Sequence, residues 1–152
     1  MEKKELIRKA YDSFSIYEKP QQCTEYLDLE DAEYNTMLLS VSRRSLTIEQ
    51  VGTVAWSPIQ SMNSDALVYF MPRLIELAVT NVIDRDGDPF FCHFINSFFE
   101  GPENQRFKLF GAEQRLILAE TFKFLCQDYY EQLEVEGWLE KTRQAYRNWG
   151  NT

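Results

Sequence analysis

Apolar residues recur every three to four positions along most of the chain, which is the spacing of one face of an α-helix. In the first such segment, Leu6, Ala10 and Phe14 fall on one face. Similar stripes predict six or seven helices, at about residues 2–17, 26–40, 48–55, 64–82, 89–99, 112–133 and 138–149. No segment alternates apolar and polar residues as a half-exposed strand does. We therefore expect an all-α fold, formed as a single globular domain over residues 1–152.

Local signals predict where several of these helices begin. Thr47 and Gln50 have the spacing of a capping box, in which two side chains satisfy unpaired backbone groups of the first turn. Ser64-Asp65 is expected to cap the next helix. Asp88-Pro89 combines a capping residue with proline, which is favoured at the first helical position. Pro72 lies inside the pattern of residues 64–82 and predicts a kink or a break there.

Composition places the chain among ordinary globular proteins, with 44% apolar and 26% charged residues in a length of 152. Its longest charge-free stretch, residues 50–64, is rich in polar residues and contains Pro58, so it does not predict a membrane span. The first residues lack the apolar run of a secretory signal. The cysteines are odd in number and far apart (Cys23, Cys92 and Cys126), which argues against both a disulfide framework and a zinc site. We expect a cytoplasmic protein with reduced thiols.

Motifs for catalysis, phosphate binding or metal binding are absent from the sequence. No two glycines are closer than ten positions, so glycine-rich phosphate loops are excluded. The only histidine, His93, has no metal ligand three or four positions away, and it is interpreted as a core or interface residue. The acidic run of residues 84–88 lacks the glycine at position six and the glutamate at position twelve of a calcium loop. We expect no cofactor, no bound metal and no enzymatic activity.

Negative charge is concentrated in two windows of the chain. Residues 20–42 and residues 124–140 each hold five carboxylates and no lysine or arginine. The whole chain has a formal charge of −8, so the ten carboxylates of the windows leave the remaining residues with a net +2. Tyrosines accompany the carboxylates, with Tyr26 and Tyr34 in the first window and Tyr129 and Tyr130 in the second.

Carboxylates beside aromatic rings are suited to a basic protein partner, because charge steers the encounter and rings supply contact area. The sequence therefore predicts a partner-binding surface formed by Glu25, Asp28, Glu30, Asp31, Glu33, Tyr34, Asp128, Glu131, Glu134 and Glu136. A solvated acidic face that confers only solubility is the alternative interpretation. Nucleic-acid binding is not expected, because a phosphate backbone requires a basic stripe. Membrane association is not expected either.

Two resemblances bear on function. The stretch of residues 65–74, followed by Phe110-Gly111-Ala112-Glu113-Gln114, is similar to a pattern in small helical bacterial proteins without an established activity, and it implies a bacterial origin. By type, small acidic chains without catalytic residues resemble the immunity proteins that bacteria pair with secreted toxins, many of whose nuclease domains are basic. This likeness implies a non-enzymatic protein that binds and blocks a basic partner. The alternatives are a structural or regulatory helical domain, which could form a homodimer, and an enzyme with a site assembled from scattered carboxylates and His93.

Overall fold

The computed structural model describes residues 1–25 and 27–151, and over these residues the protein is all-α. They form eight α-helices and two short 3₁₀ helices, with isolated bridges at Thr24–Met62 and Ile83–Pro89 in place of strands. The elements are α1 (Lys3–Phe14), α2 (Leu29–Leu39), α3 (Ile48–Val51), η1 (Pro58–Ser61), α4 (Ser64–Val79), α5 (Phe90–Phe98), η2 (Gln105–Phe107), α6 (Ala112–Asp128), α7 (Tyr130–Val135) and α8 (Leu139–Gly150).

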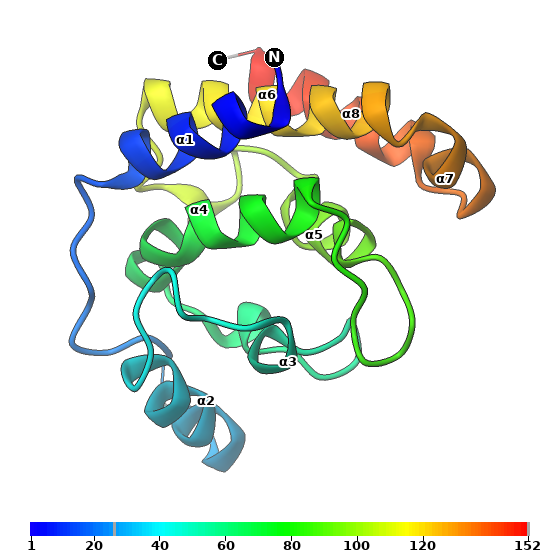
Figure 1. Cartoon of the computed structure of the whole chain (residues 1–152). Helices are drawn as coiled ribbons and strands as arrows, with labels where there is room; N and C mark the ends of the chain where they lie inside the picture. The colour runs from blue at the N-terminus through cyan, green and yellow to red at the C-terminus, as the bar shows by residue number, and fades with distance from the viewer. Residues whose placement is uncertain (26, 152) are drawn as a thin grey trace.

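The helices lie in layers, as Figure 1 shows. Helices α1, α6 and α8 form the upper layer, in which α6 packs along α8 and α1 packs against α6. Helices α4 and α5 lie beneath them, and α4 packs against α1, α5 and α6. Helix α2 lies at the lower left, where it contacts η1, and α7 lies at the upper right. The two acidic windows of the sequence are thus carried by helices at opposite ends of the molecule.

Aromatic side chains join the layers into one core. Phe94 and Phe98 of α5 have ring centroids 5.0 Å apart, and Phe98 lies 5.6 Å from Phe107 of η2. Phe107 in turn lies 5.5 Å from Trp149 of α8, and the indole of Trp149 donates a hydrogen bond of 2.7 Å to the carbonyl of Phe98. Phe94 also contacts Phe122 of α6. Pairs of this kind add to the free energy gained from burying the rings, and they link α5 to η2, α6 and α8.

The pattern of α5, apolar nearly all round, predicts a buried helix, and the structure confirms it. Every residue of α5 except Asn96 and Ser97 is buried. His93 is fully buried, as expected for a core histidine, and the three cysteines are free thiols.

The sequence underestimates the number of helices. The segment of residues 112–133 is not one helix but two, α6 and α7, which meet at Tyr129. Tyr129 leaves the helical conformation (φ −120°, ψ 29°), its hydroxyl donates a hydrogen bond of 2.6 Å to the carbonyl of Val79, and its ring stacks on Phe91. These partners come from α4 and α5, so tertiary contacts and not local propensity divide the segment.

The helix ends agree with the sequence only in part. The capping box of Thr47 and Gln50 is confirmed. Ser64-Asp65 does not cap α4, because Asn63 does so by accepting a hydrogen bond from the Ala66 amide. Asp88 does not cap α5, whose N-cap is Pro89 without a side-chain hydrogen bond. No break occurs at Pro72, since α4 continues through it.

Helix α3 is shorter than the predicted segment of residues 48–55 because Gly52 ends it. Gly52 adopts φ 82° and ψ −154°, a conformation open almost only to glycine. A Cβ atom at this position would overlap the carbonyl oxygen of Trp56. The chain turns back immediately, through paired backbone hydrogen bonds between Thr53 and Trp56 of 2.9 and 3.2 Å.

Candidate protein-binding surfaces

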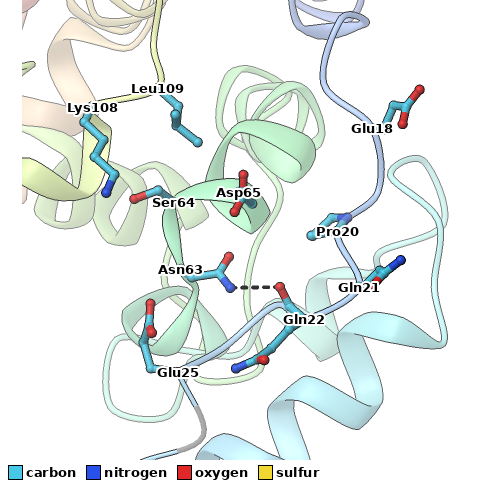
Figure 2. A pocket seen from close by; sticks show the side chains of 10 residues that line it. All are labelled: Glu18, Pro20, Gln21, Gln22, Glu25, Asn63, Ser64, Asp65, Lys108 and Leu109. Carbon is cyan, nitrogen blue, oxygen red and sulfur yellow. Dashed lines mark hydrogen bonds between the residues drawn. The ribbon is translucent and has the colours of Figure 1, made fainter.

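The first acidic window is fixed to the rest of the fold by a short extended segment before α2. The Cys23 amide donates a hydrogen bond of 2.6 Å to the side-chain oxygen of Asn35 on α2, and the Cys23 carbonyl accepts one of 2.8 Å from the Asn63 amide. The Asn63 side chain donates to the carbonyl of Gln22 at 2.8 Å, which Figure 2 shows as a dashed line. These bonds place Glu25 beside the start of α4.

Two of the predicted partner-binding carboxylates of this window are engaged in forming α2. Asp28 is the N-cap, and its side chain accepts a hydrogen bond of 2.8 Å from the Asp31 amide. Asp31 is only 8% exposed, its carboxylate accepts from the Leu27 amide at 3.3 Å, and its carbonyl accepts from the Thr24 hydroxyl. The expectation that Asp31 belongs to a partner-binding surface does not fit its position: it is buried because it closes the first turn of the helix.

The other carboxylates of the window face solvent together with two leucines. Glu25, Glu30 and Glu33 are exposed, and Leu27 and Leu29 are 80% and 76% exposed. We call these five residues the α2 surface. The helical pattern predicts Leu29 on the apolar face of α2, and the structure shows the opposite. Among the described residues, the ion pairs within 4.0 Å include none of the α2-surface carboxylates.

Tyr34 lies next to this surface and is half-buried. Burial raises the pKa of its hydroxyl, and the neighbouring carboxylates Glu30, Asp31 and Glu33 raise it further. Tyr34 is therefore a neutral hydrogen-bonding group at physiological pH.

A cleft of about 570 Å³ lies beside the α2 surface, between the extended segment and the start of α4. Figure 2 shows the side chains that line it, namely Glu18, Pro20, Gln21, Gln22, Glu25, Asn63, Ser64, Asp65, Lys108 and Leu109. Three of them are carboxylates and one is a lysine, so the cleft is acidic. A second recess of about 410 Å³ shares Glu25, Asn63 and Ser64 with this cleft and extends to Leu27. Glu25 therefore lines both recesses.

The second acidic window forms a separate surface around α7. Asp128, Glu131, Glu134 and Glu136 are exposed, and we call these four carboxylates the α7 surface. None of them belongs to an ion pair within 4.0 Å in the described part of the chain. The neighbouring helix α8 brings cations close to this end of the molecule.

The cations beside the α7 surface contact aromatic rings, and Arg143 also pairs with Glu140, the last carboxylate of the window, at 2.6 Å. The Arg143 guanidinium lies 5.9 Å from the ring centroid of Tyr130, and the Lys141 ammonium lies 4.0 Å from that of Phe99 and 5.2 Å from that of Trp138. The second window lacks Lys and Arg in sequence, but the fold places two of them at its side. The first window likewise has Lys108 and Arg106 beside its recesses.

Other titratable groups have mainly structural roles. Burial lowers the pKa of His93 to about 4, so its imidazole is neutral, and neither ring nitrogen has a hydrogen-bond partner within the protein. Burial raises the pKa of Cys92 to about 12, so its thiol is a poor nucleophile. No group of three or more His, Cys, Asp or Glu residues that could hold a metal ion occurs in residues 1–25 and 27–151.

A cluster of arginines and tyrosines joins α1 to α4 and was not anticipated from the sequence. The Tyr11 hydroxyl donates a hydrogen bond of 2.7 Å to Glu76, and Arg73 pairs with the same carboxylate at 2.8 Å. Burial would raise the pKa of Glu76, but these two hydrogen bonds lower it overall. The Arg44 guanidinium lies 3.8 Å from the ring centroid of Tyr11, and Arg43 donates to carbonyls of α1 and α4. The groups satisfy one another, so the cluster holds the loop before α3 in place.

Sequence reasoning also missed Leu27, Leu29, Glu18 and Asp65 as members of the candidate site. The leucines have one weak signal in the sequence: Asp28 is a good capping residue, which places Leu27 before the helix and Leu29 in its first turn. No local signal places Glu18 and Asp65 near Glu25, because they are brought there by the fold.

Comparison of the chain with protein-family models, with curated proteins and with solved structures finds no match. Within the described residues, none of the helices has both the length and the apolar character that crossing a bilayer requires.

Proposed function

We propose that the protein is a non-enzymatic binding protein of the immunity or antitoxin kind, which acts in the cytoplasm on a basic protein partner. The observation that supports this proposal is the grouping of exposed carboxylates, without ion-pair partners, on the α2 and α7 surfaces. Like charges gathered in this way disfavour the compact state slightly, but they accelerate encounter with an oppositely charged protein.

Such a surface blocks its partner by covering the residues that the partner needs. A toxin nuclease must present lysines and arginines to bind the phosphates of its substrate. An acidic protein that docks on those side chains competes directly with the nucleic acid. Inhibition of this kind requires no catalytic group in the inhibitor, only complementary charge and shape.

Affinity capture from the native cell tests the proposal, if it is carried out with charge-reversed variants. The immobilised full chain should retain a protein of high isoelectric point, identified by mass spectrometry. At least one of two charge reversals, Glu30→Lys with Glu33→Lys or Glu131→Lys with Glu134→Lys, should reduce the amount retained at least tenfold. We chose Glu33 as the partner of Glu30 because reversal of the buried Asp31 would disturb the helix itself.

A matched control keeps net charge out of the comparison. Glu49→Lys with Glu103→Lys makes the same change in charge at exposed positions outside both surfaces. This variant should retain the partner at the wild-type level. If all three double variants retain the same proteins in the same amounts, the acidic surfaces are not binding surfaces and the proposal fails.

A further inference from the structure

We propose that the docking face of the molecule is the α2 surface, and that it takes a basic protein segment whose aliphatic side chains lie beside its lysines or arginines. This inference rests on the proposed function, and it assigns that function to one of the two acidic surfaces.

The first observation is the exposure of two neighbouring leucines. Leu27 and Leu29 are 80% and 76% exposed, although the protein buries most of its large aliphatic side chains. They lie on either side of Asp28, the capping residue that fixes the start of α2. Adjacent exposed leucines at a fixed helix end offer apolar area to a partner without reordering of the backbone.

The second observation is the charge that surrounds these leucines. Glu30 and Glu33 follow on α2, and Glu25 precedes, each exposed and each outside the ion pairs of the described residues. An anionic membrane and a nucleic acid would both be repelled by this rim. A protein segment with cations flanking an apolar contact matches it, because the partner's cations meet carboxylates where its aliphatic groups meet the leucines.

The third observation is the shape of the surface. The recess of about 410 Å³ is lined by both Glu25 and Leu27, and it shares Glu25, Asn63 and Ser64 with the cleft of about 570 Å³ shown in Figure 2. The cations near these recesses are Lys108 and Arg106. Arg106 is engaged with the carbonyls of Ile59 and Met62, at 2.6 and 3.4 Å. The recesses, which both include Glu25, can therefore receive lysine or arginine side chains of the partner beside its carboxylate.

The two acidic surfaces share several features. The α7 surface also has an exposed apolar side chain, Val135, and a recess of about 480 Å³ lined by Asp128 and Glu131. Each surface has two cations at its side, and Arg143 near α7 pairs with Glu140 at 2.6 Å. What distinguishes the α2 surface is its pair of neighbouring leucines, both more than three-quarters exposed, beside carboxylates that have no ion-pair partner within the described residues.

Two synthetic peptides test the inference on the full, isotope-labelled chain. The first has fifteen residues, with leucines at helical spacing and lysines elsewhere, and the second has serine in place of every leucine at the same charge. On titration with the first peptide, amide resonances should shift mainly within residues 25–34 and 63–65. The serine peptide should bind at least tenfold more weakly, because it lacks the aliphatic contact.

Variants of the chain complete the test. Leu27→Ser with Leu29→Ser, and separately Glu30→Gln with Glu33→Gln, should each weaken binding of the leucine peptide at least tenfold. Leu116→Ser, at a leucine that is also exposed but lies on α6, and Glu131→Gln with Glu134→Gln should change it less than twofold. Circular dichroism confirms that each variant is folded.

The outcomes separate this inference from the function on which it rests. If the shifts map to α7 and binding falls only with Glu131→Gln and Glu134→Gln, the assignment to α2 is overturned while the proposed function stands. If both peptides bind equally, the leucines take no part and the inference is overturned. If neither acidic surface responds to either peptide, the inference is overturned, and the capture experiment decides the proposed function separately.

Discussion

Replacement of His93 by leucine should make the protein more stable in weak acid. His93 is fully buried in α5, and neither of its ring nitrogens has a hydrogen-bond partner within the protein. Burial lowers its pKa from the ordinary 6.5 to about 4, although the Asp84 carboxylate acts weakly in the other direction. Leucine is close to histidine in volume, so the core can accept it without a large cavity.

The pKa difference fixes the sign and the size of the effect. The unfolded chain binds a proton at His93 more tightly than the folded chain, so the stability of the wild type falls as pH drops through 6.5 and levels off below about 4. Because a tenfold difference in proton affinity corresponds to about 1.4 kcal/mol, this loss is roughly 3 kcal/mol. Above pH 6.5 both states hold neutral histidine, and the pH-dependent contribution disappears.

Urea unfolding at several pH values between 7.5 and 4, followed by tryptophan fluorescence, measures this difference. The carboxylates titrate in both proteins, so the informative quantity is the free energy of unfolding of His93→Leu minus that of the wild type. This quantity should grow by about 3 kcal/mol as pH falls from 6.5 to 4. Ser97→Ala removes another buried oxygen without a partner, but nothing that titrates, and its difference from wild type should not depend on pH. A constant difference for His93→Leu would show that the imidazole is solvated or paired and refute the reasoning.

Three further substitutions test the packing and the helix ends. Phe94→Ala should lower the free energy of unfolding by about 3–5 kcal/mol, because a ring central to the core is lost and a cavity remains; a loss below about 1 kcal/mol in urea unfolding would contradict its place there. Gly52→Ala should lower the free energy of unfolding more than Gly87→Ala. Both positions have positive φ, which destabilises an alanine there by about 1–3 kcal/mol, but only at position 52 would the new Cβ also overlap a carbonyl oxygen. Equal shifts in melting temperature would argue against the close approach. Asp28→Ala should lower the free energy of unfolding by about 1 kcal/mol through loss of the N-cap, whereas Glu30→Ala should change it by less than about 0.5 kcal/mol. A larger loss for Glu30→Ala than for Asp28→Ala would contradict the assignment of Asp28 as the cap of α2.

The fold class could be predicted from the sequence because it depends on local patterns. The capping box at Thr47 and the apolar periodicity of α5 involve residues close together in the chain, so no tertiary information is needed. The sequence could not decide between Asn63 and Ser64 as the cap of α4, because both are good capping residues. In the structure Asn63 is the cap, and its backbone N–H also donates a hydrogen bond to the carbonyl of Cys23, a residue distant in sequence. The break at Tyr129 likewise follows from contacts with distant helices.

The candidate site could be predicted only as a list of charged residues. Composition identified the two acidic windows, but a charge count cannot distinguish Asp31, which closes a helix turn, from Glu33, which faces solvent. Periodicity grouped Leu29 with Leu38, but it cannot show that only the later turns of α2 pack against the rest of the fold: Leu38 is buried and Leu29 is not. The recesses beside Glu25 arise from segments about forty residues apart, such as residues 18–25 and 63–65, and they have no signature in the local sequence.

The association rate constant with the captured basic partner, measured as a function of salt, tests the central claim most directly. Attraction between exposed charges is screened over a Debye length of about 8 Å at physiological ionic strength. The rate for wild type should therefore fall steeply as salt rises, and Glu30→Lys with Glu33→Lys should slow it at least tenfold at low salt. Glu49→Lys with Glu103→Lys should leave it near the wild-type value. Rates that are independent of salt, and equal for wild type and both variants, would contradict the claim that this protein recognises its partner through acidic surface.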